Sequence, residues 1–93
     1  MPAWQVALTP AAGRQIDRLR GVDLMAIRGV ILALADEPRP PGASKLAGTR
    51  DLWRVRVRIE GQPWRIVYQL RTREHLVLIT RVAHRGEGTY RQL

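Results

Sequence analysis

A strict alternation of apolar and basic residues runs through residues 52–59, which read LWRVRVRI. Successive side chains of a β-strand point to opposite faces, so this pattern predicts a strand with one apolar face and one cationic face. Arg54, Arg56 and Arg58 would then form a row. Like charges aligned on one face repel each other, and folding gives no reason to place them there. We therefore infer that a polyanion meets this face.

The first half of the chain shows helical signals. Thr9 and Pro10 are typical of a helix N-cap and a first helical position. We predict that this first helix is capped by Gly21 at its C-terminus, and that Asp23 caps a second helix, which ends before Pro38. The second helix carries apolar residues at helical spacing, namely Leu24, Ile27, Ile31 and Leu34. The short link between the helices predicts an antiparallel hairpin.

Three further segments have the composition of strands. Residues 4–8 alternate as a short strand, and residues 64–70 and 75–83 have the composition of two longer strands. A turn at 60–63 joins the strand at 52–59 to the strand at 64–70, and a turn at 72–74 joins the two longer strands. The predicted order is β-α-α-β-β-β. Close turns favour an antiparallel meander, with the helical hairpin on one face of the sheet and the arginines on the other. The fold class is therefore α+β.

Length and charge narrow the function. The 93 residues suit one small domain, residues 1–93. The net charge is +8, from 16 basic and 8 acidic residues, which favours nucleic acid or an acidic protein as the partner. Lys45 is the only lysine. Arginine binds phosphate better than lysine does, because its planar fork donates two hydrogen bonds at once.

Several classes of function are disfavoured. The chain has no cysteine, and its two histidines have no neighbouring acid at a metal-ligand spacing. We therefore expect no metal and no cofactor. The N-terminus lacks the pattern of a signal peptide, and the longest apolar run, residues 30–35, is too short to cross a bilayer. We expect a cytoplasmic protein without a membrane partner.

Four short motifs follow one another along the chain. They are KLAG at residues 45–48, WRVRV at 53–57, WRIVY at 64–68, and His84-Arg85 followed by Tyr90. They resemble the K-L-x-G, Y-R-I-R, Y-R-I-I-Y and H-R-x(4)-Y patterns of the RelE/ParE toxin superfamily, in the same order and at similar separations. Each motif alone is weak. Together they cover nearly the whole chain and form a specific signal.

The resemblance implies a toxin of a type II toxin–antitoxin pair. RelE-branch members cut messenger RNA in the ribosomal A site, whereas ParE-branch members share the fold, poison DNA gyrase and lack the cleavage residues. This chain has matching residues at the RelE working positions: Arg54, Arg56, Arg65, Arg85 and Tyr90. We therefore expect a ribosome-dependent endoribonuclease. The alternatives are a ParE-type gyrase poison and a non-catalytic RNA-binding module.

The expected partners are the ribosome, messenger RNA, and a cognate antitoxin that has an acidic segment and sets the oligomeric state. Metal-free RNA cleavage uses the ribose 2′-hydroxyl as nucleophile and leaves a 2′,3′-cyclic phosphate. Arg65, with Arg54 or Arg56, would neutralise the phosphorane. Arg85 would assist the leaving 5′-oxygen. Tyr90 would stack on a base or contact the 2′-hydroxyl region.

Three more residues are candidate RNA contacts: Lys45, Arg58 and Arg81. Arg58 has a phosphate-positioning role or none, and Lys45 is equally well explained as a surface lysine. The general base is open, because Arg54 and Arg56 stand where RelE members have lysines and arginine does not lose its proton. His84 would suit neutral pH. If the last strand runs on through Arg85, however, His84 points away from the face of Arg85 and toward the helix side of the sheet.

Overall fold

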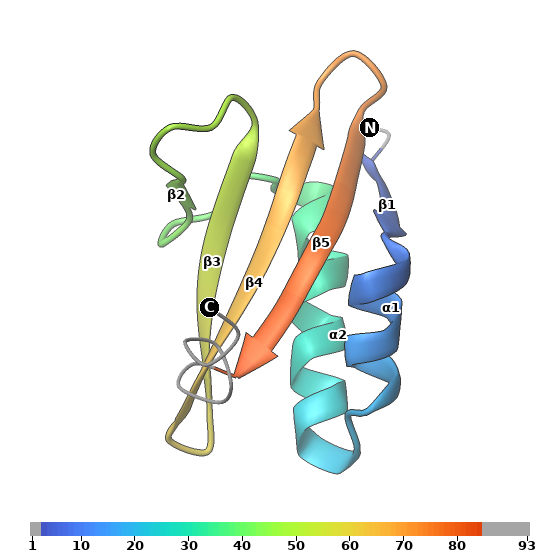
Figure 1. Ribbon diagram of the computed structural model, residues 1–93, viewed down its shortest axis with the longest axis vertical. Helices are drawn as coiled ribbons and strands as arrows, with labels where there is room; N and C mark the ends of the chain where they lie inside the picture. The colour runs from blue at the N-terminus through green and yellow to red at the C-terminus, as the bar shows by residue number, and fades with distance from the viewer. Residues whose placement is uncertain (1–2, 85–93) are drawn as a thin grey trace.

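A five-stranded sheet carries a helical hairpin on one face (Figure 1). The computed structural model describes residues 3–84. The predicted β-α-α-β-β-β order is confirmed, with one two-residue strand added. The elements are β1 (Gln5–Leu8), α1 (Pro10–Asp17), α2 (Gly21–Asp36), β2 (Ser44–Lys45), β3 (Leu52–Ile59), β4 (Gln62–Arg71) and β5 (Leu76–His84).

The strands lie in the order β1-β5-β4-β3-β2. Strands β3, β4 and β5 form the predicted antiparallel meander, and β2 adds to its edge. Strand β1 pairs with β5 in parallel, whereas the sequence pattern predicts an antiparallel sheet. A parallel neighbour needs a long crossover connection, and the helical hairpin together with β2–β4 supplies it. The first and last strands are therefore neighbours.

The start of α1 follows the sequence prediction. The Thr9 side chain accepts a hydrogen bond from the Ala12 amide at 3.2 Å, and Pro10 is the first helical residue. The link between the helices differs from the prediction. Helix α1 ends at Asp17, and Gly21, whose φ is 56°, is the first residue of α2 rather than the cap of α1.

Asp23 is not the N-cap of α2. Arg20 holds that position and makes no side-chain capping bond. Asp23 lies in the first helical turn, where a carboxylate interacts favourably with the positive end of the helix dipole. Because glycine adopts a positive φ without steric cost, Gly21 can make the sharp turn itself and begin the helix earlier than a side-chain cap would.

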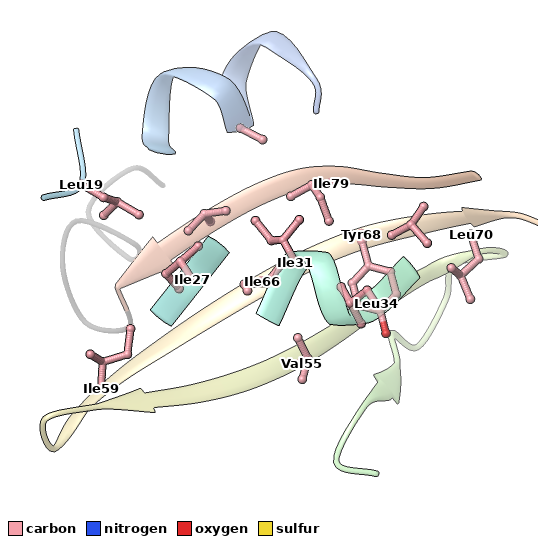
Figure 2. Close-up of a cluster of buried hydrophobic side chains, with 13 residues drawn as sticks. Leu19, Ile27, Ile31, Leu34, Val55, Ile59, Ile66, Tyr68, Leu70 and Ile79 are labelled. Carbon is pink, nitrogen blue, oxygen red and sulfur yellow. The ribbon is translucent and has the colours of Figure 1, made fainter. Parts of the chain in front are cut away.

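The core lies between α2 and the meander (Figure 2). Ile27, Ile31 and Leu34 of α2 face the sheet, where Ile66 and Tyr68 are fully buried. Helix α1 covers β5 and β1. Within residues 3–84, no helix is both long and apolar enough to span a bilayer.

A β-bulge interrupts β5. Tyr68 pairs with Ile79 and Val67 pairs with Arg81, so Thr80 is an extra residue without a partner. The Thr80 hydroxyl donates to the Val67 carbonyl at 3.2 Å. Each residue after the bulge therefore points to the face opposite to the one that simple alternation along β5 would give.

Helix α1 and its cap hold the bulged part of β5. The Thr9 hydroxyl donates to the Thr80 carbonyl at 3.4 Å. The Val82 amide donates to Oε1 of Gln15 at 2.6 Å. The pairing of β1 stops at Leu8, opposite Ile79, so Gln15 supplies the acceptor that a longer β1 would have given.

Candidate functional site

Arginines from three adjacent strands share the sheet face opposite the helices. Residues that pair directly across strands point to the same side, so the register assigns each side chain to a face. Arg56 of β3 pairs with Arg65 of β4. Val67 of β4 pairs with Arg54 on one side and with Arg81 of β5 on the other. Arg58 of β3 pairs with Pro63. We call this set the arginine face; its members are Arg54, Arg56, Arg58, Arg65 and Arg81.

The centre of the arginine face is a pair of like charges. Arg56 of β3 lies directly opposite Arg65 of β4. Like charges in this position destabilise a sheet. The Nε atom of Arg65 is buried and makes no hydrogen bond within residues 3–84. A buried donor without a partner also costs free energy. Both costs fall when an anion binds between the two guanidinium groups.

The bulge at Thr80 brings Arg81 to this face. Ile79 points toward the helices, so simple alternation would send Arg81 there as well. The extra residue shifts the parity, and Val82 takes the buried position instead. Arg81 is one of the RNA contacts predicted above, but no residue pattern in β5 indicates the bulge that orients it.

Lys45 is not brought to the arginine face. Lys45 pairs with Trp53, and Trp53 shares a face of β3 with Val55, which is buried under the helices. Lys45 therefore lies on the helix side of the sheet. The β2 residue on the arginine side is Ser44, opposite Arg54. Sequence analysis missed Ser44, because a two-residue strand within a Pro- and Gly-rich loop has no recognisable alternation.

The loop before β2 is anchored on the helix side. The Tyr68 hydroxyl donates to the Pro38 carbonyl at 2.7 Å. The guanidinium carbon of Arg39 lies 5.4 Å from the centre of the Trp53 ring, within the range of a cation–π contact. Burial raises the pKa of Tyr68 to about 12, and the charge of Arg39 lowers it in part. These contacts fix the edge of the sheet next to Arg54.

His84 lies on the helix side, as expected, but the bulge at Thr80 puts it there, because simple alternation from Ile79 would have placed it on the arginine face. It pairs with Trp64, and the two rings make a T-shaped contact with centroids 5.2 Å apart. Its Nε2 atom is 3.1 Å from Oε1 of Gln62. His84 therefore has structural neighbours and points away from the arginine face. Arg85 and Tyr90 lie outside the described residues.

The arginine face can bind phosphate and stabilise negative charge. Its five named members are all arginines, a residue type that does not act as a proton acceptor in proteins. They can therefore neutralise the charge that grows on phosphate oxygens during cleavage, but they cannot accept a proton. Within residues 3–84, no group of three or more His, Cys, Asp or Glu residues could hold a metal ion.

Comparison with known proteins places the chain. The family model of the ParE toxin of type II toxin–antitoxin systems, parDE, matches residues 6–88. The chain belongs to this toxin family. No curated protein sequence matches it. The fold predicted from the hydrophobic pattern and the RelE/ParE superfamily predicted from the four motifs are both confirmed.

Solved structures of RelE toxins resemble this ParE-family toxin over nearly its whole length. The RelBE2 toxin–antitoxin complex of Mycobacterium tuberculosis matches with 25% sequence identity and a TM-score of 0.76, and the match covers 94% of this chain and 97% of that chain. Isolated E. coli RelE matches at 17% identity, 97% and 93% coverage, and a TM-score of 0.77. The archaeal RelE–RelB complex of Pyrococcus horikoshii matches at 22% identity, 91% and 98% coverage, and a TM-score of 0.71.

Proposed function

We propose that this ParE-family toxin is a ribosome-dependent endoribonuclease that cuts messenger RNA. The observation that carries the proposal is the direct pairing of Arg56 with Arg65, where Arg65 Nε is buried without a hydrogen bond. An RNA phosphate between them would remove both the repulsion and the unsatisfied donor. The other three arginines extend the same face along the RNA backbone.

Cleavage would proceed by in-line attack of the ribose 2′-hydroxyl on the adjacent phosphate. The products are a 2′,3′-cyclic phosphate and a free 5′-hydroxyl. Arg65 and Arg56 would stabilise the negative charge that builds up on the non-bridging oxygens. The resemblance to RelE supports further roles for Arg85 at the leaving oxygen and for Tyr90 near the base.

The general base that accepts the proton of the 2′-hydroxyl must lie outside the arginine face, because its arginines cannot accept a proton. His84 carries an imidazole, the usual side chain of a general base, but it pairs with Trp64 on the opposite side of the sheet. We therefore expect His84→Gln to retain the pH–rate profile of the unsubstituted toxin. Single-turnover cleavage from pH 5.5 to 8.5 measures it. Loss of cleavage with intact folding and ribosome binding would identify His84 as the base.

The test of function is primer extension on a translated message. The toxin should produce discrete cuts with 2′,3′-cyclic ends, and Arg65→Ala should abolish most of them. Arg73→Ala is the matched control, because Arg73 is exposed in the turn between β4 and β5 and lies off the arginine face. Equal losses in both variants would argue against a specific role for the arginine face.

A gyrase poison is the second candidate. The family model that matches the chain bears the ParE name, and ParE-branch toxins share this fold. The same expression experiment separates the two functions. Gyrase-linked DNA breaks with intact messages would establish the gyrase function and remove the catalytic roles proposed for the arginines.

An antitoxin with an acidic segment is the expected inhibitor. The M. tuberculosis and P. horikoshii neighbours are toxin–antitoxin complexes, and the net charge of +8 favours an acidic partner. We propose that this segment lies across the arginine face or displaces the segment that carries Tyr90. A complex structure with the arginine face open and Tyr90 undisturbed would contradict this.

A further inference from the structure

Helix α2 is apolar on the side that faces away from the sheet. Met25 is 75% exposed, Leu32 is 56% exposed and Val22 is 49% exposed. Together with the exposed Gly29 they recur at intervals of three, four and three residues, which places them on one side of the helix. We call these four residues the outer stripe. A helix that is apolar on both sides usually has a second contact.

The net positive charge of the protein is distributed unevenly along the chain. The hairpin, residues 10–37, contains four basic and four acidic residues and is neutral. They are Arg14, Arg18, Arg20, Arg28, Asp17, Asp23, Asp36 and Glu37. The whole excess of +8 therefore lies outside the hairpin. An acidic partner gains no net attraction from the hairpin, and a second copy meets no net repulsion there.

The outer stripe is complementary to itself in an antiparallel arrangement. The spacing reads the same in both directions, so Val22 would lie opposite Leu32 and Met25 opposite Gly29. A Cβ at Gly29 would have no atom within 4 Å, so this position leaves room for a large side chain. Methionine is flexible enough to fill such a space. Each end of the pair repeats the same contacts, as a two-fold interface requires.

The ends of α2 support the same orientation. Asp36 lies four residues beyond Leu32 on the same side of the helix and is exposed, as is the adjacent Glu37. In an antiparallel pair they approach the turn between the helices of the other copy, where Arg18 is exposed. Opposite charges and opposite helix-dipole ends then meet at both ends of the contact.

We propose that the outer stripe of α2 is a homodimer interface in which two copies pair antiparallel. The stripe spans ten residues, about 15 Å of helix. Such a contact is smaller than the roughly 800 Å² per partner of a standard interface, so the dimer is weak and depends on concentration. The two arginine faces point away from each other and stay open. This proposal does not rest on the proposed nuclease activity.

Single cysteines test the geometry, because the chain has none of its own. We expect a mixture of Val22→Cys and Leu32→Cys chains to form a mixed disulfide under mild oxidation. Each variant alone should crosslink at least tenfold less, because its two sulfurs would be about 15 Å apart along the helix, beyond disulfide reach. Preferential crosslinking of Val22→Cys with itself would overturn the antiparallel dimer.

Sedimentation velocity of the full chain over a concentration series tests the association. Met25→Glu should weaken it roughly tenfold or more, because a charge in an apolar contact is costly. Leu8→Glu is the control: Leu8 is exposed on β1, away from the stripe, and its substitution should leave association unchanged. Circular dichroism verifies the fold of both. A chain that stays monomeric throughout, or a Met25→Glu effect confined to antitoxin binding, would overturn the proposal.

Discussion

Arg65 and Arg58 lie on the same face of the sheet but differ in how firmly they are held. Arg65 belongs to β4, the middle strand of five, and its Nε is buried. Arg58 is exposed near the end of β3, where its guanidinium donates to the Gly61 carbonyl at 3.1 Å. A rigid donor can favour the transition state, whereas an exposed donor mainly attracts the phosphate backbone.

We therefore expect alanine at Arg65 and alanine at Arg58 to affect different steps, the first the cleavage rate and the second ribosome binding. Arg65→Ala should lower the single-turnover cleavage rate by about a hundredfold or more, the scale of losing one charge-stabilising donor, and change ribosome binding little. Arg58→Ala should weaken binding and leave the rate of the bound complex unchanged. Single-turnover kinetics with saturating and limiting ribosomes separate the two. An equal effect of both variants on the bound rate would contradict the division.

Tyr68 predicts a dependence of stability on pH. Its pKa in the folded state is raised to about 12 from 10.0, so folding favours the neutral phenol. This contribution is complete below pH 10 and is lost as the pH rises through about 12. We expect urea unfolding to show a steeper loss of stability between pH 9.5 and 11.5 in the unsubstituted chain than in Tyr68→Phe. Parallel curves would contradict the raised pKa.

At the scale of elements, the bulge and the edge of β5 depend on α1. Oε1 of Gln15 accepts from the Val82 amide, a bond that joins the first helix to the last strand. Val82 is buried, so the amide has no easy alternative in water. The position of Arg81 on the arginine face follows from the same local geometry.

Gln15→Leu should therefore destabilise the protein by roughly 1–3 kcal/mol, the cost of leaving a buried donor unsatisfied. Gln15→Glu keeps an acceptor in place and should lose much less. Urea unfolding of both variants gives the difference. If Gln15→Leu unfolds at the same urea concentration as the unsubstituted chain, Gln15 does not hold the strand.

The sequence predicted those elements in which local chemistry decides the structure. The strand at 52–59 and the Thr9–Pro10 helix start match, because period-two alternation and capping act over a few residues. The parallel pairing of β1 and the unpaired Thr80 were not predictable, since both depend on contacts between distant segments. In the candidate site, the alternation in residues 52–59 predicted the row of arginines in β3. The pairing of Arg56 with Arg65 could not be predicted, because it depends on the register between β3 and β4.

At the scale of the whole molecule, the net positive charge lies outside the helical hairpin. Because binding to RNA releases counterions, affinity for ribosomes or RNA should fall by about 0.7–0.9 log units per log unit of salt for each phosphate contacted. Removing one arginine of the arginine face should reduce the slope by about one contact. Arg28→Ala on the neutral hairpin should leave the slope unchanged. Filter binding over a salt series measures all three, and an affinity independent of salt would contradict phosphate contacts.

The parallel pairing of β1 with β5 also bears on how the toxin is made. The bond from Thr9 to Thr80 joins positions 71 residues apart, and β1 has no sheet partner until β5 has been synthesised. Contacts this distant form late in folding. We expect a growing chain to remain protease-sensitive until β5 has left the exit tunnel. Arrested nascent chains of increasing length, probed with a protease, should gain resistance only after residue 84 emerges.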